Sequence, residues 1–250
     1  VGTQRGLNRW DNTTGEWTAF STRLGLSNDQ VTDLAADPKY VWVGTEKGLS
    51  RYDKAKDAWD TIAELGEVPI LAITENDGNV AVATEQGIYV HEDVTTWRQI
   101  EIETELVSDT LALDGDKLWI AGWRHVMWYD IPSGQIRQFT DEDAQGLSRV
   151  RVHDIKNSMQ YVWVATDGGI YRYDRADDTW WSYSPSRERG STEVLVDRNI
   201  LAIAVSDEFL FFGTPTGISR YDKVTDSWLN YTTRDGLVHQ YVSSLAWHGE

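Results

Sequence analysis

The sequence predicts an all-β fold assembled from one repeated unit. Residues 41–53 read VWVGTEKGLSRYD, in which two short β-branched or aromatic runs are joined by a tight turn ending at Gly48. This pattern is typical of a β-hairpin. Similar text returns five more times, and the positions equivalent to Thr45 are Thr3, Thr84, Gly122, Thr166 and Thr214. A strand-only repeat of roughly 40 residues is typical of the blades of a β-propeller.

Each repeat contains four expected strands, which we name A to D from the inside of a blade outward. Strand A has a Val-x-x-Leu pattern at residues 31–34, 70–73, 152–155, 200–203 and 242–245, with 108–111 as the divergent copy. Strands B and C are the two halves of the VWVGT/GLSRYD text. Strand D is expected at residues 17–20, 59–62, 97–100, 136–139, 180–183 and 228–231. No segment of any length has the period of a helix.

The phase of the repeat predicts how the ring closes. The chain starts in a strand B and ends in a strand A, so pairing the two gives six complete four-stranded antiparallel blades. We therefore expect a single domain over 1–250, in which blade one consists of 1–30 plus 241–250 and the other five lie within 31–240. Closure by the C-terminal strand removes an exposed sheet edge. The alternative is a fragment of a larger ring.

Composition excludes several classes of function. The 250 residues carry a net charge of -17, which argues against nucleic-acid binding because that depends on neutralising phosphates. No apolar run reaches membrane-spanning length, and the absence of cysteine excludes disulfides and thiolate chemistry. The histidines show no metal-ligand spacing. We expect no cofactor, no metal, no nucleic acid, no membrane insertion, and a monomer when the domain is isolated.

The repeat resembles a known family. The text from Val41 to Trp59, with the Gly-Leu-Ser-Asn and Val of residues 25–31, is similar to the two-component regulator propeller repeat. This resemblance implies a propeller on the periplasmic side, secreted or at the cell surface of a prokaryote, often as the sensory part of a hybrid histidine kinase. The family motif is structural and implies no catalytic residue.

Two rows of repeated residues are interpreted as structural. Aspartates end most copies of strand C: Asp11, Asp53, Asp130, Asp174 and Asp222. Aspartate at the start of a turn accepts backbone N–H groups, whereas calcium needs six or more converging oxygens. The tryptophans of strands B and D are expected to pack between sheets. Trp123, Trp181 and Trp247 fall outside these rows and are better candidates for exposed binding residues.

The candidate site lies where loops depart from the repeat. In a propeller the D–A and B–C loops share the channel-mouth face, and here they hold a basic sector. The turn at 122–125 reads Gly-Trp-Arg-His, so His125 stands where other repeats have a glycine with positive φ. The candidate ligand-binding residues are Trp123, Arg124, His125, Arg149, Arg151, Arg187, Arg189, Arg198 and His239.

Arginine offers a planar fork that suits a carboxylate, phosphate or sulfate. We therefore expect an unidentified anionic small molecule or acidic partner segment at this sector. The competing interpretation is a solvated surface in which the arginines pair with Glu188, Glu193 and Asp197. For the whole domain we expect a non-catalytic sensory or interaction module. The alternatives are a lyase or hydrolase that uses His125, His153 or His239 as acid or base, and an adhesive module of a surface protein.

Overall fold

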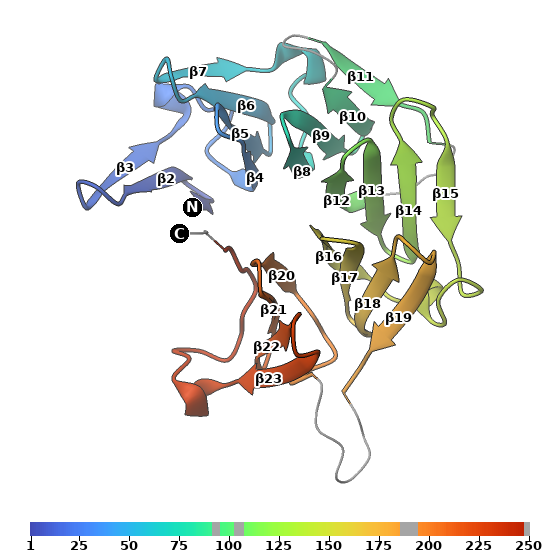
Figure 1. The fold of residues 1–250 in the computed structure, drawn as a ribbon. Coiled ribbons are helices and arrows are strands. Elements are labelled where there is room, and N and C mark those ends of the chain that lie inside the picture. Colours follow the sequence, from blue (N-terminus) through green and yellow to red (C-terminus); the bar gives the residue numbers. More distant parts are fainter. Residues whose placement is uncertain (92–95, 103–107, 186–194, 248–250) are drawn as a thin grey trace. The chain divides into compact units, whose positions relative to one another are not determined.

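The computed structural model describes residues 1–91, 96–102, 108–185 and 195–247, and these residues form an all-β structure. They contain six sheets, one of three strands and five of four, together with four single-turn 3₁₀ helices. In each sheet the strands follow one another in chain order as hydrogen-bonded neighbours, as expected for blades (Figure 1).

The strand bounds agree closely with the repeat. The first sheet contains β1 (Gly2–Thr3), β2 (Gly6–Asp11) and β3 (Glu16–Phe20). The second contains β4 (Val31–Ala36), β5 (Tyr40–Thr45), β6 (Gly48–Asp53) and β7 (Ala58–Thr61). The third contains β8 (Ile70–Asn76), β9 (Asn79–Thr84), β10 (Gly87–His91) and β11 (Trp97–Ile100).

The fourth sheet contains β12 (Ser108–Asp114), β13 (Lys117–Gly122), β14 (His125–Asp130) and β15 (Ile136–Phe139). The fifth contains β16 (Val152–Ser158), β17 (Tyr161–Thr166), β18 (Gly169–Asp174) and β19 (Thr179–Tyr183). The sixth contains β20 (Ala202–Val205), β21 (Phe209–Thr214), β22 (Gly217–Asp222) and β23 (Ser227–Tyr231). The 3₁₀ helices η1 (Thr22–Leu24), η2 (Ala63–Leu65), η3 (Leu147–Arg149) and η4 (Thr233–Asp235) lie in D–A loops.

The chain's contacts group into two compact units. One unit comprises Val1–Leu118 with Asp130–Gln135, and the other comprises Trp119–Tyr129 with Ile136–Glu250. Everything described below is a feature of one unit or the other. The arginine-rich loops belong to the second unit, and a pocket described below belongs to the first.

A threonine closes the B–C hairpin in five of the six described sheets. Thr45 Oγ1 donates to the carbonyl of Gly48 at 2.8 Å and accepts the N–H of Lys47 at 3.2 Å. Thr3, Thr84, Thr166 and Thr214 make the same pair of bonds. Side-chain bonds of this kind stabilise turns. Gly48 has a φ of 108°, a conformation that favours glycine because it has no Cβ.

In the second, fourth and fifth sheets a strand-B tryptophan packs against the aromatic side chains of the next sheet. Trp163 is 1% exposed, and its ring centroid lies 5.7 Å from that of Phe212 and 5.3 Å from that of Tyr221 in the next sheet. Trp42 and Trp119 are equally buried. Aromatic rings bury a large apolar area in such positions, so the predicted packing role is confirmed for the strand-B row. Trp17 of the strand-D row is 60% exposed and contacts only Trp10 of its own sheet among the described ring pairs, which corrects the expectation for that residue.

The motif arginine of strand C is also a packing residue. The guanidinium carbon of Arg172 lies 4.5 Å from the ring centroid of Tyr161, and Arg220 lies at the same distance from Phe209. Arg51 is 4.7 Å from Tyr40. These cation–π contacts hold the planar guanidinium against the aromatic side chains of its own sheet. They explain why the repeat carries arginine at this position.

The aspartates that end strand C act as turn caps, as predicted. Asp222 Oδ1 accepts the N–H groups of Val224 and Thr225, each at 2.9 Å. The bond from the Thr225 N–H is the main cause that lowers the pKa of this carboxyl. Asp11 makes the same two bonds, to Thr13 and Thr14. These oxygens serve the local backbone, which agrees with the structural interpretation of the row.

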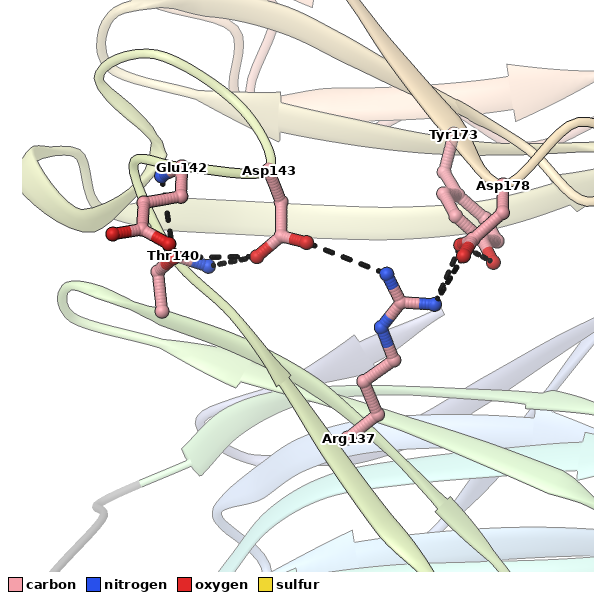
Figure 2. Close-up of polar contacts among 6 residues, drawn as sticks. All are labelled: Arg137, Thr140, Glu142, Asp143, Tyr173 and Asp178. Atoms are coloured by element: carbon pink, nitrogen blue, oxygen red, sulfur yellow. Dashed lines mark hydrogen bonds and ion pairs between the residues drawn. The ribbon is translucent and has the colours of Figure 1, made fainter.

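A tyrosine–aspartate contact joins strand C to the following turn. Tyr173 donates to Asp178 Oδ1 at 2.8 Å, and Arg137 Nη1 donates to both carboxylate oxygens of Asp178 at 2.6 Å. Figure 2 shows Arg137 between Asp178 and Asp143, with Thr140 bonded to Asp143. Burial and the bond to Asp178 raise the pKa of Tyr173 to about 12. The phenol is therefore held neutral at ordinary pH.

The C-terminal segment does not form the expected fourth strand of the first sheet. Residues 241–247 have no strand, and the described strand β1 pairs with β2. The segment instead lies on the last sheet: the N–H of Val242 donates to the Thr214 carbonyl at 2.9 Å, and Trp247 stacks on Phe211. The bond from Val242 matches the one from Ile200 to Thr166 in the preceding repeat. The segment therefore makes the first backbone hydrogen bond expected of a strand A, but it does not form a hydrogen-bonded β-ladder.

Candidate functional site

The divergent turn between β13 and β14 consists of Trp123 and Arg124. Arg124 has a φ of 65°, so the left-handed residue of this turn is Arg124 and not His125, which corrects the expectation from the repeat. Gly122 stands in place of the threonine, so this turn has no threonine hydroxyl to close it. The turn is bonded to the neighbouring loop. The Arg124 N–H donates to the Val150 carbonyl at 3.0 Å, and Arg124 Nε donates to Ser148 O at 3.2 Å.

The side chains of this turn point to different environments. Trp123 is 59% exposed, and Trp181 and Trp247 are exposed to a similar extent, as predicted from their positions outside the repeat rows. His125 is only 3% exposed, and its Nδ1 lies 3.1 Å from the Trp123 carbonyl. The imidazole is therefore part of the packed turn. Trp123 and Arg124 form the surface at this point.

Arg149, at the end of η3, is paired with an aspartate of its own loop. Its Nε lies 3.1 Å from Asp141 Oδ2, and the arginine side chain is 76% exposed. Asp141 also accepts the N–H of Ser148 at 3.0 Å. Hydrogen bonding by Ser148 is the main cause that lowers the pKa of Asp141, and the charge of Arg149 adds to it. The pair is solvent-screened, so the guanidinium is available to an incoming anion at small cost.

Arg151 and Arg198 meet at Asp167, in the turn between β17 and β18. The N–H of Arg151 donates to Asp167 Oδ1 at 3.1 Å, and the N–H of Asp167 donates to the Arg151 carbonyl at 3.2 Å. Arg198 Nε donates to the Asp167 carbonyl at 3.2 Å. Trp123 forms an isolated β-bridge with Arg151. The loops of three successive sheets are therefore joined into one surface.

We call this surface the arginine sector and define it as Trp123, Arg124, Arg149, Arg151 and Arg198. Asp197 is one of the acids considered as a partner of the arginines. It bonds to Asn199 and Thr216, while Arg198 bonds to Asp167. Arg187 and Arg189, with the acids Glu188 and Glu193, lie outside the described residues. His239 is exposed and accepts the Tyr241 N–H at 3.0 Å, which is a local contact of its own loop.

The chemistry available at the sector is recognition of an anion. Arginine forks supply charge-assisted donors, and Trp123 supplies an exposed ring. Among the described residues there is no group of three or more histidine or acidic side chains placed to hold a metal ion. Within the same residues, no helix is long and apolar enough to cross a membrane.

The first unit contains a pocket of about 770 Å³ that sequence reasoning missed. Its walls are the A–B loops of the second and third sheets, residues 36–40 and 75–79, with three side chains from strands. Those side chains are Trp42, Arg51 and His91. The pocket thus lies at A–B turns, the loops opposite to those of the predicted site. One signal was present in the sequence: His91 stands where most repeats have tyrosine.

Comparison with protein-family models gives no match, and comparison with curated protein sequences gives none either. Solved structures do match. One is the extracellular domain of the B. thetaiotaomicron protein BT4673, described as a hybrid two component system, with a TM-score of 0.65 and 19% identity. The match covers 87% of this chain and 29% of that one, so this chain spans under a third of that protein domain's length.

Two further structures match across most of this chain. The computationally designed protein Ika8 has a TM-score of 0.69 and 18% identity, over 99% of this chain and 74% of that one. The WD40 repeats of RRP9 have a TM-score of 0.65 and 13% identity, over 86% and 69% respectively. At such identities the likeness shows the fold alone. It establishes a propeller-like all-β architecture.

Proposed function

We propose that the six sheets are the blades of one propeller and that the domain is a non-catalytic, extracytoplasmic sensory or interaction module. Its ligand is an anionic small molecule or an acidic partner segment, bound at the arginine sector. The likeness to the extracellular domain of a hybrid two component system supports this class of function. Long loops on a rigid β scaffold are common places for binding residues.

The observation that carries the proposal is the joining of these loops: the Arg151 backbone and Arg198 Nε both bond to Asp167, and Arg124 Nε bonds to the adjoining loop. These cations lie in a chain of net charge -17. The net negative charge of the rest of the chain repels an anion, so the arginine sector is a local region of positive charge. No described feature favours the lyase, hydrolase or adhesive alternatives, and His125 is buried in its turn.

Calorimetry at low salt tests the proposal. The probes are glucuronic acid, a sulfated disaccharide and a short polyglutamate peptide. We expect at least one to bind, and we expect the double variant Arg149→Glu, Arg198→Glu to weaken it by at least about tenfold, since each charge-assisted hydrogen bond contributes roughly 1.5–3 kcal/mol. Binding should also weaken as salt rises.

The matched control is Arg23→Glu, Arg234→Glu. These arginines are exposed and lie in the 3₁₀ helices of other D–A loops, so the control changes net charge equally. It should bind as the original protein does. The proposal is wrong if none of the probes binds, or if both double variants bind equally well while remaining folded.

A further inference from the structure

The pocket in the first unit coincides with a change in the repeat. His91 pairs with Trp97 across β10 and β11 as Tyr52 pairs with Trp59 across β6 and β7. His91 is therefore the counterpart of the motif tyrosine, which in other sheets is Tyr52, Tyr129, Tyr173 and Tyr221. The third sheet has an imidazole where these sheets have a phenol.

The phenols of the other sheets have a defined environment. Tyr52 donates to Asp57 and accepts a bond from Arg9 Nη1, in the preceding sheet, at 3.2 Å. In the sheet shown in Figure 2, an arginine of the preceding sheet again lies beside the acceptor aspartate of the phenol. In these two sheets the socket of the phenol thus contains an aromatic neighbour, an arginine of the preceding sheet and a carboxylate that accepts the hydroxyl.

At His91 the tryptophan and the arginine of the socket are present, and the phenol is replaced by an imidazole. The imidazole is 5.6 Å from the Trp42 ring, in an edge-on contact like the one that a phenol makes elsewhere. Arg51, the counterpart of Arg9, lines the pocket together with Tyr40. An imidazole is shorter than a phenol and has no hydroxyl. His91 itself lines the pocket.

The opposite wall supplies hydrogen-bond acceptors. Glu75, Asn76, Asp77 and Asn79 line it, and the N–H of Gly78 donates to Glu75 Oε1 at 2.9 Å, which fixes that carboxyl in place. Burial is the main cause that raises the pKa of Glu75, which is half-buried in this wall. Asp37, by contrast, is used by the N–H groups of Lys39 and Tyr40.

We propose that this pocket binds a small hydroxy-aromatic ligand whose phenol takes the place of the missing tyrosine. Its ring lies beside Trp42 and His91, and its hydroxyl lies between the Arg51 guanidinium and the acceptors of the 75–79 turn. The volume of about 770 Å³ falls in the range of small-molecule sites and leaves room for a second part of the ligand. This site is independent of the arginine sector.

Calorimetric titration with two matched probes tests the proposal. 4-Hydroxyphenylacetamide carries the phenol, and phenylacetamide differs only by the absent hydroxyl. We expect the phenol to bind at least about tenfold more tightly, because a hydrogen bond to a charged group is lost in the other probe. Equal affinity of the two probes, or saturable binding by neither at millimolar concentration, overturns the proposal.

Variants locate the site. His91→Tyr restores the phenol of the repeat and should abolish binding, whereas His239→Tyr makes the same exchange at an exposed position of the other unit and should leave binding unchanged. Glu75→Ala gives an independent test: affinity for the phenol probe should fall about tenfold and affinity for phenylacetamide should not change. Undiminished phenol binding by folded His91→Tyr or Glu75→Ala overturns the site.

A tyrosine-containing pentapeptide is the third probe and distinguishes the source of the phenol. A small-molecule site should accept the free phenol at least as well as the peptide. If the peptide binds at least about tenfold more tightly, in a manner that His91→Tyr abolishes, the occupant is a side chain of a protein partner and the small-ligand proposal is wrong.

Discussion

The interface between the fifth and sixth sheets and that between the second and third are built from the same repeat but differ at the position of the motif tyrosine. In the former, Trp163 meets Tyr221, whose hydroxyl donates to Asp226 at 2.8 Å. In the latter, Trp42 meets His91 beside a pocket. The strands and the strand-B tryptophan are alike. The difference teaches that the repeat encodes packing and that, in this first unit, a departure from the repeat coincides with a pocket.

The largest expected effect is at the buried tryptophan. Trp163→Ala should lower the free energy of unfolding by about 3–5 kcal/mol, because it leaves a cavity among rings that remain fixed. Trp42→Ala should cost less, since Trp42 already borders open volume and has fewer packed atoms to lose on that side. Urea denaturation measures both. Equal losses would mean that the two interfaces are packed equally well.

The next effect is at the motif arginine. Arg172→Gln should lower the free energy of unfolding by about 1–2 kcal/mol, because the guanidinium lies over the rings of Tyr161, Trp163 and Tyr183. Arg172→Lys keeps the charge but not the planar group, so its free energy of unfolding should lie between that of the unaltered protein and that of Arg172→Gln. The same denaturation experiment checks this. A neutral Arg172→Gln would contradict a packing role for the motif arginine.

A smaller, pH-dependent effect is expected at the phenol of the fifth sheet. Tyr173→Phe removes the bond to Asp178 and should cost about 1 kcal/mol at neutral pH. The folded-state pKa of Tyr173 is about 12, above the unfolded value of about 10. Its contribution is therefore complete below about pH 10 and is lost as pH rises through about 12.

Denaturation at a series of alkaline pH values measures this contribution. Since the phenylalanine variant has no phenol to ionise, its stability should fall less steeply between about pH 10 and 12 than that of the unaltered protein. Parallel curves would show that Tyr173 titrates alike in the folded and unfolded chains.

The smallest effect should be at the arginine sector. Arg149→Ala should change stability by no more than about 0.5 kcal/mol, because its pair with Asp141 is exposed to solvent. Asp141→Ala should cost more, since Asp141 also holds the N–H of Ser148. Thermal melts of both variants measure the difference. A large loss in Arg149→Ala would make this arginine a structural residue.

The sequence by itself determined most of the strands, though not the one expected at 242–245, and the roles of several repeated residues. The threonine turns, the aspartate caps and the buried Trp42 follow from bonds and contacts that recur with the period of the chain. Hydrogen bonds such as that from Thr45 to Gly48 span three residues, so local text is enough to specify them. The exposure of Trp123 follows in the same way, because this residue lies outside the repeat.

The tertiary structure alone decided which side chains face each other across loops and sheets. It placed the left-handed conformation at Arg124 and bonded this turn to the loop at Val150. It laid Val242 on the sixth sheet without a ladder to β1. It also placed His91 in the wall of a pocket. Side-chain volume between two sheets depends on both of them, and the period of a single sequence does not specify it.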